Sequence, residues 1–191
     1  PDLFQPKAIC LAKNAAGEGH LGTECVGHAV AFTPETAPLL AAGVHLAVVA
    51  VDNNRTRLLA SRFFRAQRVP VIFTAVSEAS DYGWAFVQAA HGACLACVFP
   101  TVAHADAERK RCTPSPATLD ILKVMGGIVL YAIDSFLMER YRYWSFRSVH
   151  LAGGAPDIQE QVQPRPDCPL CGVQVNGASD EGDERLHAST T

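Results

Sequence analysis

The sequence has little net charge. Its 16 lysines and arginines nearly balance 19 aspartates and glutamates, which leaves a formal net charge of −3. Nucleic acids and anionic membranes attract proteins through basic surfaces, so this composition gives no reason to expect either partner. The basic run at 109–111 is too short to change that expectation, and an independent zinc-binding nucleic-acid module is therefore disfavoured.

The sequence also lacks a long uncharged apolar run. Its longest apolar region, about residues 117–138, contains Asp120, Lys123 and Asp134. Charges of this kind are costly inside a bilayer. The N-terminus shows no charged segment followed by an apolar stretch, as a secretory signal would. We therefore expect a cytoplasmic protein with no membrane partner.

The patterning predicts an α/β fold for most of the 191 residues. Apolar runs at 45–51 and 69–76 predict strands buried on both faces, with a helix at 54–67 between them and a shorter strand at 84–89. This order is typical of a doubly wound, Rossmann-like sheet with parallel strands. Further elements are predicted as helices at 7–16, 33–43 and 117–140, strands at 25–32 and 141–151, and a loop at 152–167.

Four of the seven cysteines form two CxxC pairs, Cys94 with Cys97 and Cys168 with Cys171. Zinc favours four thiolates in a tetrahedron, and each CxxC turn presents two sulfurs to one ion. The pairs lie far apart in the chain, so the predicted zinc would join the loop after the sheet to the C-terminal segment. A closed four-sulfur site leaves no position for substrate, which makes this zinc structural.

Two other interpretations of these cysteines stay open: four unrelated buried thiols, or a redox CxxC pair. Redox motifs usually open a helix after a strand, whereas Cys94 follows a Gly-Ala pair and Cys168 follows Pro166 closely. The remaining cysteines Cys10 and Cys25 fall on predicted secondary structure and are expected in the core.

Two segments could contact a nucleotide. Gly17–Gly22 matches G-x-G-x-x-G, but a helix is predicted before it and a strand after it, the reverse of the phosphate-binding context. Asp52-Asn53 follows the strand at 45–51, where ligands of open α/β sheets bind. The Asp52 carboxylate could hold Mg²⁺ or cap the next helix, and Asn53 could also be its cap.

Several segments together resemble the ThiF/HesA/MoeB adenylyltransferases and the ubiquitin-activating enzymes. Val51–Leu59 resembles the D-N-x-x-x-R motif of that family, and the segments at 91–100 and 166–172 resemble its two CxxC segments. Residues 70–76 resemble the intervening strand. Pro6-Lys7-Ala8 resembles an R-P-K-A segment in which Gln5 replaces the arginine. The likeness covers about residues 1–172.

The resemblance implies ATP-Mg²⁺-dependent adenylation of the C-terminal carboxylate of a ubiquitin-like or sulfur-carrier protein. By position, Asp52 would ligate Mg²⁺, Lys7 would contact ATP phosphates, and Asn53 and Arg57 would support the site. Residues 1–176 would be the C-terminal part of such a domain, followed by a polar, acidic tail at 177–191 that is expected to be disordered. A homodimer or heterodimer is implied as well.

The family's Gly-rich ATP loop has no counterpart before Pro1, so we expect this chain alone to adenylate poorly or not at all. The alternative is a non-catalytic, zinc-stapled partner subunit of an activating-enzyme dimer. Cys112 matches the family's transfer cysteine, and its basic neighbours at 109–111 would favour the thiolate. An ordinary loop thiol is the alternative, and His91 or His104 could serve as a base.

Overall fold

The computed structural model of the protein describes residues 4–18, 22–104 and 117–172. The chain divides into two compact units, residues 1–42 and residues 43–191. The first unit contains α1 (Lys7–Glu18) and α2 (Ala37–Leu40). The helix predicted at 7–16 is confirmed. The strand predicted at 25–32 is wrong, because residues 22–33 form no regular structure.

The helix predicted at 33–43 is much shorter than expected. The Thr36 hydroxyl accepts a hydrogen bond from the Thr33 backbone N–H at 2.9 Å and donates to the Ala31 carbonyl at 2.6 Å. Side-chain bonds of this kind hold the backbone in a turn and compete with helix formation. The helix consequently begins only at Ala37. Gly43, where the predicted helix was to end, has φ of +73°, a conformation that glycine adopts without strain.

The second unit is built on one five-stranded sheet in the order β1-β2-β3-β4-β5. The strands are β1 (Ala47–Val49), β2 (Val71–Val76), β3 (Tyr82–Gln88), β4 (Phe146–His150) and β5 (Ile158–Glu160). The strands predicted at 45–51, 69–76, 84–89 and 141–151 are confirmed with shifted bounds. The segment predicted as loop at 152–167 contains β5, whose side chains are all exposed, so no apolar pattern marks it.

The sheet is mixed, which corrects the expectation of a parallel, doubly wound arrangement. Only β1 and β2 are parallel, joined through α3 (Asn54–Ala66); all other neighbours are antiparallel. The turn at 77–81, closed by a hydrogen bond from Ser77 N–H to the Tyr82 carbonyl, is too short to hold a crossover helix. It therefore forces β3 to run back along β2.

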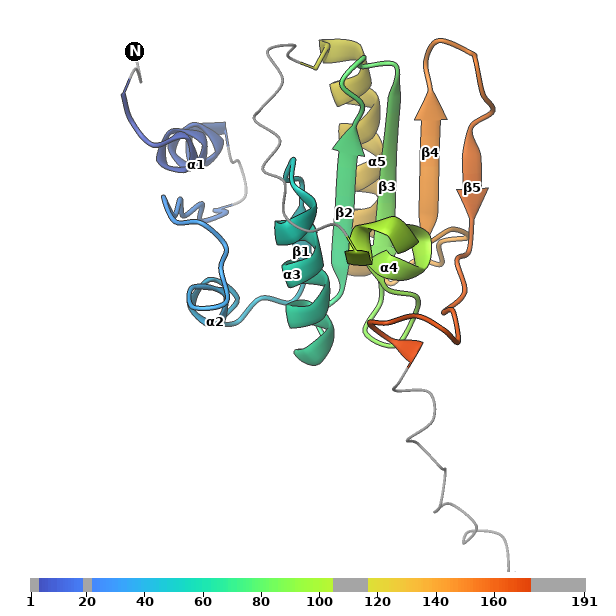
Figure 1. The fold of residues 1–191 in the computed structure, drawn as a ribbon. Coiled ribbons are helices and arrows are strands. Elements are labelled where there is room, and N and C mark those ends of the chain that lie inside the picture. The colour runs from blue at the N-terminus through green and yellow to red at the C-terminus, as the bar shows by residue number, and fades with distance from the viewer. Residues whose placement is uncertain (1–3, 19–21, 105–116, 173–191) are drawn as a thin grey trace, which may run out of the picture. The chain divides into compact units, whose positions relative to one another are not determined.

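Helices cover both faces of this sheet (Figure 1). The helix α5 (Leu119–Leu137) packs on one face against β2 and β3, while α3 and the short α4 (Leu95–Val98) lie on the other. The predicted helices at 54–67 and 117–140 are thereby confirmed. On the α5 face, Ile121 and Met125 pack with Ile72 of β2. A Cβ on Gly83 of β3 would lie 2.6 Å from the sulfur of Met125, so a larger residue there would displace the Met125 side chain.

Burial differs between the two parallel strands. In β2 the side chains Val71, Ile72 and Phe73 are completely buried, as predicted for a strand covered on both faces. The strand β1 forms the edge of the sheet, and its Val48 is 47% exposed, so the prediction fails there. Among the described residues, no helix combines the length and apolarity needed to cross a membrane.

Candidate metal centre and strand-end site

Two short backbone turns bring four cysteines together on the α3 side of the sheet. Cys94 precedes α4 and Cys97 lies within it, where its N–H donates to the Cys94 carbonyl at 2.9 Å. The second turn is closed by a hydrogen bond from Gly172 N–H to the Cys168 carbonyl at 2.8 Å. The structure thus joins the two CxxC pairs, although they are far apart in the sequence.

The geometry of the four sulfurs suits one tetrahedral metal ion. All four ligand atoms lie within 4.8 Å of one another, and all four residues are buried. The Sγ–Sγ distance is 3.8 Å for Cys94–Cys97, 3.4 Å for Cys94–Cys168 and 3.3 Å for Cys97–Cys171. Sulfurs bound to one zinc at about 2.3 Å are spaced about 3.8 Å apart. The donor set therefore fits zinc, and none of the four is in a disulfide.

Burial also governs the protonation of the cysteines in this cluster. Burial raises the pKa of Cys94 well above its usual range, and it raises that of Cys171 to about 11. Burial acts the same way on Cys168, but backbone hydrogen bonds from Leu170 and Cys171 outweigh it and lower its pKa to about 7. Four thiolates cannot be held so close together without a positive ion to balance them.

Close backbone packing fixes the second cysteine turn. A Cβ on Gly172 would lie 2.4 Å from the Pro166 carbonyl oxygen, so only glycine fits at this position. The Arg165 N–H points at the Cys97 sulfur at 3.4 Å, which links the second turn to the first. Hydrogen bonds of this kind stabilise thiolate ligands.

A buried glutamine, Gln88, ties the first cysteine turn to α3. Its Oε1 accepts hydrogen bonds from the Ser61 hydroxyl at 2.6 Å and from the Leu95 N–H at 3.2 Å. Its Nε2 donates to the Ser61 carbonyl at 2.9 Å. Sequence reasoning missed Gln88 and Ser61. One feature of the sequence could have indicated Gln88: it is a lone amide side chain at the end of an apolar strand, a few residues before the first CxxC pair.

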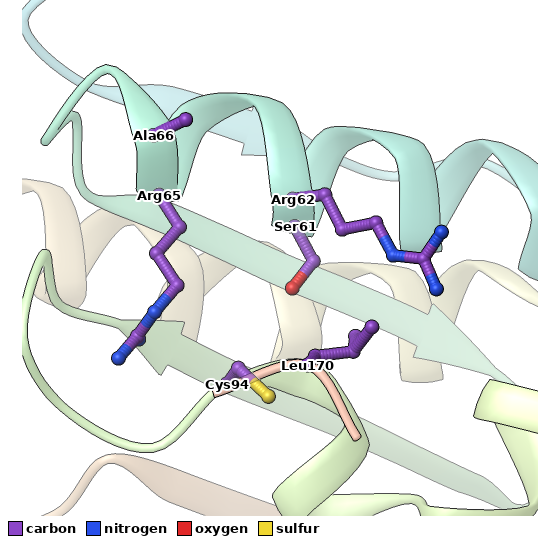
Figure 2. A pocket seen from close by; sticks show the side chains of 6 residues that line it. All are labelled: Ser61, Arg62, Arg65, Ala66, Cys94 and Leu170. Carbon is purple, nitrogen blue, oxygen red and sulfur yellow. The ribbon is translucent and has the colours of Figure 1, made fainter. Parts of the chain in front are cut away.

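A small pocket lies beside the metal centre (Figure 2). Its volume is about 100 Å³, well below the several hundred Å³ typical of sites for molecules of nucleotide size. Arg65 is held beside it by a hydrogen bond from Nη1 to the Gly92 carbonyl at 2.8 Å. The pocket is lined by Ser61, Arg62, Arg65, Ala66, Cys94 and Leu170. It does not include the strand-end residues predicted to contact ATP.

The residues after β1 form the start of α3. Asn53 is the N-cap of that helix, and its side chain accepts a hydrogen bond from Thr56 N–H at 2.8 Å. The capping alternative for Asn53 is thus what the structure shows. Asp52 precedes it with an exposed side chain, at the carboxyl end of β1. A carboxylate there is favourably placed near the positive end of the helix dipole.

Arg57 holds this segment in place through two hydrogen bonds and an aromatic contact. Its Nη2 donates to the Val51 carbonyl at 2.6 Å, its Nη1 donates to Asn54 Oδ1 at 2.9 Å, and its guanidinium lies 5.6 Å from the centre of the Trp84 ring. Burial lowers the pKa of Arg57, and the charge of Asp52 offsets part of that effect. Arg57 therefore fixes the path of the chain from β1 into α3.

Replacing Asn53 with alanine should lower the free energy of unfolding by about 1 kcal/mol, because the Thr56 N–H loses its partner. Asn53→Asp should retain most of the stability, since a carboxylate also caps a helix and complements its dipole. Urea denaturation measures both. Equal stability of the alanine variant and the natural protein would contradict the capping role.

The other predicted residues are placed as follows. Lys7 is the first residue of α1, in the first unit. Cys10 and Cys25 belong to the same unit and are partly exposed, which corrects their expected place in the core. Cys112 and the basic run at 109–111 lie outside the described residues, as does the tail at 177–191. His91 is exposed, and His104 ends the short 3-10 helix η1 (Pro100–His104).

Comparisons with known proteins place the fold. No protein-family description matches this sequence, and no curated protein is similar to it. Among solved structures, Escherichia coli MccB in complex with MccA gives a TM-score of 0.66 at 12% identity, over 84% of this chain and 49% of that chain. The structure of MccB with AMPCPP and MccA gives a TM-score of 0.66 at 12% identity, over 85% of this chain and 49% of that chain. MccB crystallised alone gives a TM-score of 0.64 at 11% identity, over 92% of this chain and 51% of that chain.

The fold and site define an α/β protein with a four-cysteine cluster able to hold a metal ion. The solved structures that it resembles are those of MccB. At 11–12% identity this likeness shows a shared fold alone, and the chain spans about half the length of MccB.

Proposed function

We propose that this chain is part of an ATP-dependent enzyme that adenylates the C-terminal carboxylate of a peptide or small carrier protein. The observation that carries the proposal is the exposed Asp52 carboxylate, which follows β1 at the start of α3. In open α/β sheets this strand end is where nucleotides bind. MccB, whose fold the chain shares, has been crystallised with AMPCPP and with MccA.

In this proposal Asp52 would hold Mg²⁺, which would supply charge neutralisation at the triphosphate. A carboxylate oxygen of the substrate attacks the α-phosphorus of ATP while the bond to the bridging oxygen of pyrophosphate breaks. The products are an acyl-adenylate and pyrophosphate. Asn53 and Arg57 keep the strand-end segment in place.

A ubiquitin-like or sulfur-carrier protein is the substrate class that the sequence motifs favour. The Cys112 thiolate then attacks the acyl carbon, AMP leaves, and a thioester forms. A zinc ion held by the four cysteines would have no part in these steps. It would hold the segment at 166–172 against the loop that precedes α4.

The substitution Asp52→Asn is expected to lower ATP–pyrophosphate exchange by about 100-fold, because it removes a metal-binding charge at the reacting phosphates. Exchange is measured with the full-length natural protein and its carrier, and calorimetry with Mg²⁺ and AMPCPP reports binding without the carrier. Glu160→Gln, which removes an exposed carboxylate from β5, is the matched control and should leave both readouts unchanged.

The outcomes separate the proposal from its alternative. An active complex whose exchange is unaffected by Asp52→Asn would favour the partner-subunit role, with the nucleotide bound elsewhere. No exchange by the full-length natural protein, combined with no binding of AMPCPP, would overturn adenylation altogether. Melting curves of both variants ensure that a lost activity does not reflect unfolding.

A further inference from the structure

The helix α3 carries charge of one sign. Between residues 54 and 68 the chain has five arginines and no acidic residue, although its overall formal charge is −3. Arg57 is partly buried and holds the segment after β1. The other four lie along the helix and just past its end, and we call them the arginine stripe: Arg55, Arg62, Arg65 and Arg68.

The arginine stripe has no carboxylate partner in the part of the chain that the structure describes. Three of its members are exposed. The fourth, Arg65, donates from Nη1 to the Gly92 carbonyl, and its buried Nε has no hydrogen-bond partner. Arg62 and Arg65 are three positions apart, a spacing at which side chains on a helix are neighbours and like charges repel. An acidic partner would therefore stabilise the stripe.

The sequence after the second cysteine turn contains a matching run of acidic residues. Residues 180–184, which we call the acidic segment, lie outside the described residues. This segment has four carboxylates, no apolar side chain and no cation. Carboxylates pair with guanidinium groups through two parallel hydrogen bonds. The four carboxylates thus match the four guanidinium groups of the arginine stripe in number and in chemistry.

The covalent connection allows the acidic segment to reach the stripe. Leu170, in the second cysteine turn, lines the same small pocket as Arg62 and Arg65 (Figure 2). Asp180 follows Gly172 by eight positions, and an extended chain of that length spans at most about 29 Å. The 13 residues of α3 extend over about 20 Å. Each exposed ion pair is weak alone, but attachment to the same chain raises the effective concentration of the segment.

We propose that the acidic segment binds the arginine stripe of α3 within the same chain and covers the outer side of that helix. The basic run at 109–111 is the competing group of cations in the sequence. The stripe is favoured because the chain passes beside Arg62 and Arg65 at Leu170, and because a helix fixes the spacing of its charges.

Carbodiimide cross-linking of the zinc-loaded full chain tests this contact, because the reagent joins a carboxylate to a lysine amine only where the two touch. Arg62→Lys places an amine in the stripe, and mass spectrometry should then find residues 180–184 joined to position 62. Arg140→Lys replaces an exposed arginine after α5, on the opposite face of the sheet, and should give at least about tenfold less cross-link. At about 1 M salt the Debye length is about 3 Å, so the cross-link at position 62 should be lost.

Charge reversal within the stripe separates binding from chance encounter. Adding Arg55→Glu and Arg68→Glu to the Arg62→Lys variant should lower the yield at position 62 by at least about tenfold, while zinc content and the melting curve stay unchanged. An unchanged yield would overturn the proposal. Cross-links to Lys110 or Lys123 as frequent as those to position 62 would also overturn it. Mixing isotope-labelled and unlabelled chains identifies cross-links between chains, and a predominance of those would exclude binding within one chain.

Discussion

Removal of the metal by a chelator, or the substitution Cys168→Ser, is expected to lower the unfolding temperature by about 10 °C or more. Structural zinc sites contribute folding free energy directly, and a loss of several kcal/mol corresponds to about 2–4 °C per kcal/mol in a domain of this size. The loss is large here because the cluster joins residues 74 positions apart, and without the metal nothing binds the four sulfurs to one centre.

Elemental analysis by mass spectrometry should find one zinc ion per chain in the natural protein and much less in Cys168→Ser. Cys10→Ser is the matched control, since Cys10 belongs to the other unit and is not one of the four clustered cysteines. That variant should keep both the metal and the melting temperature. A melting curve that a chelator does not shift would contradict the prediction that the metal stabilises the fold by linking the two cysteine segments.

The metal cluster could be predicted from sequence because its chemistry is local. Each CxxC turn fixes two sulfurs within one short segment, and four cysteines in two such pairs have few other uses in a chain of this kind. The sequence could not show how the second pair reaches the first. That depends on β4 and β5 running back along the sheet, and β5 carries no apolar pattern because its side chains are exposed.

The main difference between prediction and structure is the direction of the strands, which were expected to be parallel and are mostly antiparallel. Apolar runs such as 71–76 predict burial, but burial on both faces occurs in antiparallel sheets as well when helices cover both sides. The short turn at 77–81 was the better evidence, because no crossover fits between its ends. The prediction of a strand at 25–32 was wrong for a related reason. Apolar and polar residues alternate there, but a strand also needs a neighbouring strand to pair with.

Of the strand-end residues, Asn53 and Arg57 were identified by their motif, while their observed contacts are structural. Asn53 caps α3 and Arg57 binds the Val51 carbonyl, so both positions would be required even in a protein that binds no nucleotide. The motif predicts the local structure well for this reason. A role in ATP binding is a separate property, and the Asp52→Asn variant tests it.

The substitution Gln88→Leu is expected to lower the free energy of unfolding by about 3 kcal/mol. The amide is completely buried and makes hydrogen bonds to Ser61 and to the N–H of Leu95. The apolar leucine side chain leaves the Ser61 hydroxyl and the Leu95 N–H buried without partners, and each such group costs about 1–3 kcal/mol. Because Leu95 follows Cys94 directly, the variant should also bind zinc more weakly.

Urea denaturation measures the stability of Gln88→Leu and zinc titration measures its affinity for the metal. Two further variants are the controls. Gln159→Leu replaces an exposed glutamine of β5 and should change neither stability nor zinc affinity appreciably. Ser61→Ala removes one donor but leaves the hydrogen bond between Gln88 and Leu95, so it should cost about 1 kcal/mol and spare zinc binding. If Gln88→Leu weakened stability no more than Ser61→Ala does, Gln88 would not be the link between α3 and the metal centre.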